Sequence, residues 1–138
     1  MSYLLDSSAL LAYYFGEAGG ERVRELLSNE HTVVGISVLT MAEFWSRLHA
    51  EGWANEFPAE WEAVSKLLSE VHPVSLAVVA KSLELRTAAT GRLPHVDALI
   101  AATAVAVGAT LVHRDPHFAA IPEELLKQES LPDKSPPG

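Results

Sequence analysis

Two carboxylates bracket a long uncharged segment in the last third of the chain. Asp97 begins this segment and Asp115 ends it, and no charged residue lies from Ala98 to Val112. If the segment is a helix followed by a strand, the helix descends roughly 15 Å in ten residues and the strand regains that height in about five. The two elements run antiparallel, so we expect both acids to meet at one edge of a sheet.

Two further acids follow predicted strands in the first third of the chain. Asp6 comes directly after the apolar run Tyr3–Leu5, and Glu43 lies in the second turn of a helix that follows the run Thr32–Ile36. In parallel α/β sheets, sites form outside the carboxyl ends of the strands. We therefore expect one pocket to collect four carboxylates, namely Asp6, Glu43, Asp97 and Asp115.

A cluster of four carboxylates repels itself unless a cation lies among them, because some members otherwise keep their protons at neutral pH. Mg²⁺ and Mn²⁺ prefer such oxygen ligands, and a metal held there can activate water and stabilise charge on a phosphoryl group. Zinc is disfavoured. Among the six histidines only His113 and His117 have a helical ligand spacing, and Pro116 between them breaks a helix.

Each acid, taken singly, also has an ordinary structural explanation. Asp6 could cap the helix that follows it, and Glu43 could form a surface ion pair with Arg47, four residues on. Asp97 lies in a first helical turn, where the helix dipole favours an acid, and Asp115 precedes a proline, as turn-opening residues do. The functional interpretation therefore depends on all four acids reaching the same edge.

The elements that must position these acids alternate between short apolar strands and helices. Strands are predicted at Tyr3–Leu5, Thr32–Ile36 and Thr110–Val112, with a brief extended piece at His72–Val74. Helices are predicted over Ala9–Phe15, Glu21–Leu27, Val38–Ala50, Pro58–Val71, Leu76–Thr90 and Asp97–Val107. This order predicts an α/β sandwich with a mainly parallel sheet, in which helix outweighs strand.

Composition limits the classes of protein that remain. The chain has 138 residues, enough for one domain with a sizeable core, and the absence of cysteine fits a cytoplasmic protein. It has neither a signal-peptide pattern nor an apolar run long enough for a membrane span. With 18 acidic against 10 basic residues the net charge is −8, which excludes a generic basic surface for nucleic acid.

Aromatic and basic residues outside the acidic set are given structural explanations. Three tryptophans recur every eight residues and are interpreted as core and helix packing; they are Trp45, Trp53 and Trp61. The helix after Ser37 is expected to bury one face, made of Val38, Met41, Ala42, Trp45 and Leu48. Three arginines could contact a phosphate backbone, namely Arg86, Arg92 and Arg114. Each is predicted to lie on the solvated surface, as most arginines do.

Three motifs, in this order, resemble the PIN-domain ribonucleases, specifically the VapC-type toxins of bacterial and archaeal toxin–antitoxin pairs. They are YLLDSSALLAYY, SVLTMAEFWSRL and LPHVDALIAATAVAVGATLVHRDPHF. The resemblance spans about Ser2 to Ile121, and the block from Pro94 to Phe118 is its most specific part. The family's four metal-site acids match Asp6, Glu43, Asp97 and Asp115, and its small hydroxyl residue matches Ser8.

The resemblance implies a PIN-like three-layer α/β/α sandwich over residues 1–128, with helices on both faces of the sheet, and a Pro-rich tail at residues 129–138 that is expected to be disordered. It implies an endoribonuclease dependent on Mg²⁺ or Mn²⁺, with the four acids as metal ligands and Ser8 beside them in the catalytic set. Metal-bound water would cleave single-stranded or looped RNA, leaving a 5′-phosphate and a 3′-hydroxyl. It further implies a homodimer in the cytoplasm, inhibited by a VapB-like antitoxin.

The chain departs from the family pattern at two positions. Many members carry Thr or Ser where this chain has His113, and a further acid where it has His117. These differences affect the second metal position, so the resemblance favours one firmly bound ion and leaves a second open.

The sequence disfavours three alternative functions. A catalytically silent PIN-like module that binds RNA or protein is disfavoured because all four acids are present. A haloacid-dehalogenase-like phosphatase needs an Asp where this chain has Ser8. A receiver domain needs a mid-chain phosphoacceptor Asp and a late Lys at a strand end, and the sequence offers neither.

Overall fold

The computed structural model describes residues 1–132, which build a five-stranded sheet in the order β3-β2-β1-β4-β5. Every pairing of neighbouring strands is parallel. The strands are β1 (Ser2–Leu5), β2 (Val33–Ser37), β3 (Glu70–His72), β4 (Thr110–His113) and β5 (Gln128–Ser130). The helices are α1 (Ser7–Tyr14), α2 (Gly20–Ser28), α3 (Val38–Ala50), α4 (Phe57–Ser65), α5 (Leu76–Ala88) and α6 (His95–Val107), with short 3-10 helices η1 (Ala54–Glu56) and η2 (Pro116–Ala120).

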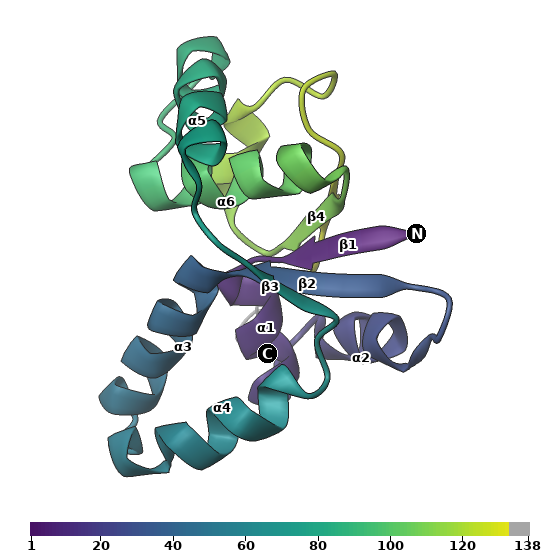
Figure 1. Cartoon of the computed structure of the whole chain (residues 1–138), viewed down its shortest axis with the longest axis vertical. Helices are drawn as coiled ribbons and strands as arrows, with labels where there is room; N and C mark the ends of the chain where they lie inside the picture. The colour runs from purple at the N-terminus through teal and green to yellow at the C-terminus, as the bar shows by residue number, and fades with distance from the viewer. Residues whose placement is uncertain (133–138) are drawn as a thin grey trace, which may run out of the picture.

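Helices cover both faces of this sheet, as Figure 1 shows, with α5 and α6 on one side and α1 to α4 on the other. Successive strand residues point to opposite faces, so Leu4 packs in the core cluster that holds α5 and α6. Its neighbour Leu5 packs in the cluster that holds α1, α3 and α4. The predicted α/β/α sandwich with a parallel sheet is confirmed.

Local sequence signals place the ends of the elements that carry the acids. Asp6 is the N-cap of α1 and accepts a hydrogen bond from the Ala9 amide at 2.9 Å. Ser37 caps α3 in the same way through the Leu39 amide. At the other end of the long apolar segment, Gly108 adopts φ 70°, the left-handed conformation that glycine tolerates, and ends α6. The chain then turns directly into β4.

Two predicted boundaries are wrong. The helix predicted to reach Val71 ends at Ser65, and residues 70–72 instead form β3, which pairs with β2. The disorder predicted from residue 129 is wrong at its first residues, because Glu129 lies in β5 opposite Val112. The Glu129 carboxylate also accepts from Arg22 Nε at 2.8 Å, and Leu131 is only 5% exposed. Residues 133–138 of the predicted tail lie outside the described residues.

The buried stripe of α3 differs from the predicted face. Thr40, Phe44 and Leu48 face the core at a spacing of four residues, whereas Trp45 is 43% exposed. Trp53 is exposed to a similar extent. Core packing therefore accounts for neither of these two tryptophans. Within residues 1–132, no helix combines the length and the apolar character that a membrane crossing requires.

Candidate metal centre and active site

Three acids that are distant in sequence meet at the carboxyl edge of the sheet. Asp6 follows β1, Asp97 lies in the first turn of α6, and Asp115 is the N-cap of η2 just beyond β4. Parallel pairing of Leu5 with Val112 brings the ends of β1 and β4 to the same level, and the Asp6 amide donates to the Val112 carbonyl at 3.0 Å. Of the four acids predicted to share one pocket, Asp97 and Asp115 lie closest together, in one group with His117. Asp6 and Glu43 lie near enough for their charges to interact with this pair.

Asp6 is the most enclosed of the acids, with 3% of the residue exposed. Burial raises the pKa of its carboxyl from 3.8 to about 7, hydrogen bonds from Ser8 and the Ala9 amide oppose this rise, and the charges of Asp115 and Asp97 add to it. The Asp6 carboxyl therefore holds a proton close to neutral pH unless a cation is present. A cation between the acids would remove this cost.

Asp97 experiences the same effects more weakly. Burial and then the Asp115 charge raise its pKa to about 6, the His117 imidazole opposes this rise, and Glu43 contributes to it. Two neighbouring carboxyls with raised pKa values are typical of functional sites. The repulsion between these carboxylates therefore favours binding of a positive charge at this edge.

Glu43 and Ser8 lie at the same edge through the start of α1. Glu43 Oε1 accepts from Ser7 Oγ at 2.6 Å, so the acid is held beside the β1–α1 junction. Ser8 Oγ donates to Asp6 Oδ1 at 2.6 Å and accepts from the Arg114 amide at 2.8 Å. Ser8 therefore links the Asp6 carboxylate to the segment that carries Asp115.

The Arg114 side chain is buried, so the prediction that it lies on the solvated surface is wrong. Its side chain is 7% exposed, and Nη2 lies 2.7 Å from Glu17 Oε1 while Nη1 donates to the Ala18 carbonyl. Glu17 also bonds Arg47 Nη2 at 3.2 Å, so Arg47 turns to Glu17 and to Glu51 rather than to Glu43. This network anchors the turn between β4 and η2 against the end of α1.

His113 is a buried structural histidine. Its Nδ1 accepts from the Asp115 amide at 3.2 Å, so Nε2 carries the proton and donates to Gln128 Oε1 at 2.8 Å. Burial lowers the pKa of His113, which keeps the ring neutral. With both nitrogens engaged, His113 positions Asp115 and offers no lone pair to a metal.

His117 differs, because its Nδ1 atom is buried and makes no hydrogen bond to any described residue. It lies 2.8 Å from Asp115 Oδ1 and 3.4 Å from Asp97 Oδ2, at ion-pair distance but outside hydrogen-bonding geometry. One ligand atom from each of Asp97, Asp115 and His117 lies within 4.8 Å of the others. This donor set fits a divalent cation. In the sequence, the only indication of this possible ligand is that position 117 holds a histidine where many family members carry an acid.

A family model described as the PIN domain matches residues 3–124. The chain belongs to the PIN domain family. The four candidate acids of this PIN domain all lie within the matched range, namely Asp6, Glu43, Asp97 and Asp115. No curated protein sequence matches the chain.

Solved structures share the fold of this PIN domain. VapBC2 from Rickettsia felis, bound to a promoter DNA fragment, matches with a TM-score of 0.78 and 23% identity over 96% of this chain and 100% of that chain. DNA-bound VapBC from Salmonella typhimurium matches with a TM-score of 0.72 and 20% identity, over 94% of this chain and 98% of that chain. VapC20 from Mycobacterium tuberculosis, a sarcin–ricin loop cleaving toxin, matches with a TM-score of 0.66 and 20% identity, over 86% of this chain and 93% of that chain. At these identities the likeness establishes a common fold.

Proposed function

We propose that this PIN-domain protein is a divalent-metal-dependent endoribonuclease and the toxin of a VapC-type toxin–antitoxin pair. The observation that carries the proposal is the meeting of Asp6, Asp97 and Asp115 at one sheet edge, beside a His117 nitrogen without a hydrogen bond. Buried acids with raised pKa values lower the stability of the metal-free fold at neutral pH, and such groups are typical of functional sites.

The ligands we propose for Mg²⁺ or Mn²⁺ are Asp6, Asp97, Asp115 and Glu43. A bound ion would activate a water for attack on the phosphodiester and stabilise the charge that develops on phosphorus-bound oxygens. Ser8 acts as a positioning residue, because its hydrogen bond fixes the orientation of the Asp6 carboxylate. His113 has the same task for the backbone of Asp115.

RNA is the substrate we propose, in single-stranded or looped form. One structural neighbour is a toxin that cleaves the sarcin–ricin loop, and unpaired bases are the parts of RNA that proteins reach most easily. The exposure of Glu43 leaves the acidic edge open on the α3 side. An extended strand can approach the acids from this side.

The test is cleavage of labelled single-stranded and hairpin RNAs. We expect products with 5′-phosphate and 3′-hydroxyl ends in Mg²⁺ or Mn²⁺, and no products in EDTA. Restoring Mn²⁺ after chelation should restore cleavage. If metal makes no difference, or if the protein neither cleaves RNA nor binds metal in calorimetry, the catalytically silent binding module becomes the better explanation.

His117 is a further ligand in this proposal, through the Nδ1 atom that makes no hydrogen bond. Mg²⁺ is a hard cation that takes oxygen ligands, so we expect His117→Ala to weaken Mn²⁺ binding by about ten- to a hundredfold and Mg²⁺ binding less. Isothermal titration calorimetry measures both affinities without RNA. His31→Ala, at an exposed histidine, is the control, and an unchanged Mn²⁺ affinity for His117→Ala would exclude this ligand.

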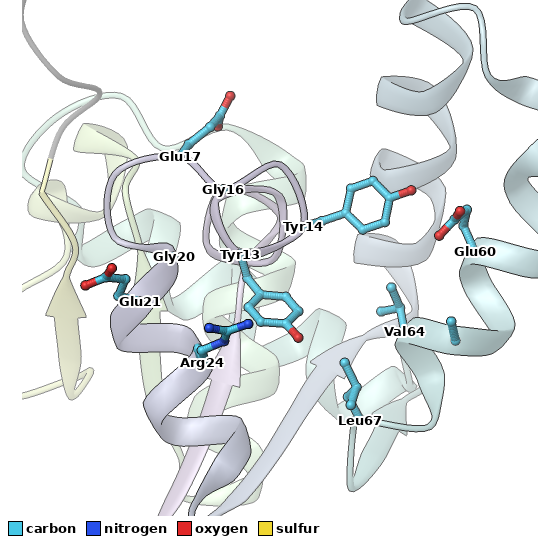
Figure 2. Close-up of a pocket in the computed structure, with 11 residues that line it drawn as sticks. Tyr13, Tyr14, Gly16, Glu17, Gly20, Glu21, Arg24, Glu60, Val64 and Leu67 are labelled. Carbon is cyan, nitrogen blue, oxygen red and sulfur yellow. The ribbon is translucent and has the colours of Figure 1, made fainter.

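A VapB-like antitoxin is the protein partner we propose. The matching Rickettsia and Salmonella structures are VapBC assemblies. In this chain a cavity of about 480 Å³ opens between α1, α2 and α4, lined by Tyr13, Tyr14 and Leu67 together with Glu21 and Glu60 (Figure 2). The lining also includes Arg24, but acidic residues outnumber it, so the cavity suits a segment with an apolar anchor and a basic side chain. A short reading frame directly upstream would encode the candidate, and its co-expression should block cleavage.

A homodimer in the cytoplasm completes the proposal. Two large apolar residues lie exposed one turn apart at the start of α5, away from the loop that joins α5 to α6, namely Leu76 and Val79. Exposed apolar stripes of this kind mark protein interfaces, and a second copy of the chain is the occupant we propose. Light scattering after size-exclusion chromatography measures the mass directly.

A further inference from the structure

An acidic protein that acts on RNA must hold a polyanion next to its own carboxylates. The chain has a net charge of −8, and the candidate site contains four acids. A divalent ion carries two positive charges, fewer than the four acids and one phosphate require, and it leaves the neighbouring phosphates of the strand without a counter-charge. A cationic surface close to the acids would supply it.

Such a surface is present between the end of α5 and the start of α6. A cavity of about 570 Å³ is lined there by three basic residues, Arg86, Arg92 and His95, together with Leu83, Thr87, Gly91, Leu93 and Pro94. No Asp or Glu belongs to its described lining. The charged residues of the cavity are therefore all basic, although acidic residues outnumber basic ones in the chain as a whole.

The cavity borders the acidic site through two elements. His95 and Asp97 both lie in the first turn of α6, about 3 Å apart along the helix axis. On the other side, the Thr90 amide donates to the Ala120 carbonyl at 2.9 Å, which packs the α5–α6 loop against the end of η2, the helix that carries His117. The cationic cavity therefore includes the first residue of α6, two residues before Asp97, and its loop is held against the end of η2.

The arginines of the cavity keep their charge for a ligand. Arg86 is oriented by donating from Nε to the Leu93 carbonyl at 3.1 Å, and its Nη1 lies 3.1 Å from His95 Nδ1. Neither contact neutralises it. Arg92 is exposed and has no hydrogen-bond or ion-pair partner within residues 1–132. By contrast, the arginines at three other positions all pair with glutamates; they are Arg22, Arg47 and Arg114.

We infer that this cavity binds a backbone phosphate of the RNA strand next to the scissile one, with Arg86, Arg92 and His95 as its donors. Guanidinium groups offer several N–H donors and match phosphate oxygens in a bidentate manner. The inference rests on the proposed nuclease function for the identity of the strand. It assigns positioning of the substrate to the α5–α6 loop, which supplies no metal ligand.

The test measures binding of a fluorescent single-stranded RNA by anisotropy in EDTA, where no cleavage is expected. Arg92→Gln should weaken binding about tenfold and reduce the slope of log affinity against log salt by about 0.7, the value for one lost contact to a single strand. Arg24→Gln removes the same charge from an exposed site outside the cavity and should change the affinity much less.

A second pair of variants adds charge instead of removing it. Thr87 is exposed, lines the cavity and bonds only within its own helix, to the Leu83 carbonyl at 2.8 Å. Thr87→Glu should therefore weaken RNA binding by at least as much as Arg92→Gln, whereas Thr87→Gln should not. Circular dichroism melting confirms that the compared proteins are folded.

The outcomes separate this inference from the nuclease proposal. Wild-type affinity in both Arg92→Gln and Thr87→Glu, or no RNA binding by the wild-type protein, would overturn the cavity assignment even if metal-dependent cleavage is present. The expected affinity losses without any metal-dependent cleavage would support the cavity and remove the nuclease. In an active enzyme, Arg92→Gln should raise KM with little change in kcat and leave Mn²⁺ affinity unchanged.

Discussion

Asp97→Asn is expected to lower metal-dependent RNA cleavage on the order of 10³-fold, the upper range for loss of one charge-stabilising group. Asparagine keeps the size of the side chain and its place in the first turn of α6, but it removes the negative charge that faces Asp115 and His117. A neutral amide is a much weaker ligand for Mg²⁺ or Mn²⁺. The measurement is kcat/KM on a labelled RNA at saturating metal, with metal affinity determined by calorimetry.

The control is Glu30→Gln, the same acid-to-amide change at an exposed position. It should leave cleavage unaltered. Unfolding cannot explain the loss in Asp97→Asn, because removal of a charge whose pKa is raised to about 6 should stabilise the metal-free fold at neutral pH. Full cleavage by Asp97→Asn with unchanged metal affinity would place the active site elsewhere.

The position of this acid could be predicted because it follows from chain geometry. The segment between Asp97 and Asp115 is uncharged, and the helix and strand that it forms have fixed rises per residue. Their return to the starting level is therefore determined by length alone. The observed helix α6 and strand β4 fulfil this expectation to within two residues at each end.

Features that depend on contacts between distant residues could not be predicted in this way. Arg114 was expected on the surface, yet it is buried by Glu17, which lies 97 residues earlier in the chain. Strand β5 forms because Glu129 pairs with the edge of β4 and with Arg22, and the polar, Pro-rich composition of the tail carries no sign of this pairing. The sequence motif also gave no indication that the two nitrogens of His113 are both engaged.

Hydrophobic periodicity was an incomplete guide to the faces of α3. An apolar stripe through Trp45 fits a helix as well as the stripe through Phe44 does, and the sequence alone does not decide between them. The structure selects Phe44, which stacks edge-on against Tyr14 and fills the core beneath β2. The consequence for function is that Glu43, beside Phe44, is carried to the edge of the acidic site.

The metal-free protein is expected to lose stability as the pH rises from about 4 to about 8, and Asp6 is the main cause. Its pKa is 3.8 in the unfolded chain and about 7 in the fold, so the folded state binds more protons across this interval. The contribution is fully present below pH 4 and is lost as the pH rises through 7. For a shift of this size the loss approaches about 4 kcal/mol, and Asp97 adds to it in the same direction.

His113 acts in the opposite sense, because its lowered pKa makes the fold less stable as the pH falls through the unfolded value of 6.5. Both wild type and Asp6→Asn contain His113, so its contribution cancels when the free energies of unfolding of the two proteins are subtracted at each pH. Asparagine can keep the N-cap bond to the Ala9 amide, so the two proteins should be similarly stable at pH 4. At pH 8 the variant should be more stable by a few kcal/mol, as measured by urea unfolding in EDTA.

Bound metal should offset much of this difference in stability. A cation bound to the ionised acids stabilises the folded wild-type protein by about 2.7 kcal/mol when its concentration is a hundred times the dissociation constant. The Asp6→Asn variant lacks one of the proposed ligands and should gain much less from Mn²⁺. If the variant and the wild type instead show the same pH dependence in EDTA, Asp6 is ionised in the metal-free fold. The acidic edge would then be stabilised by its hydrogen bonds from Ser8 and Ala9 rather than poised for a metal.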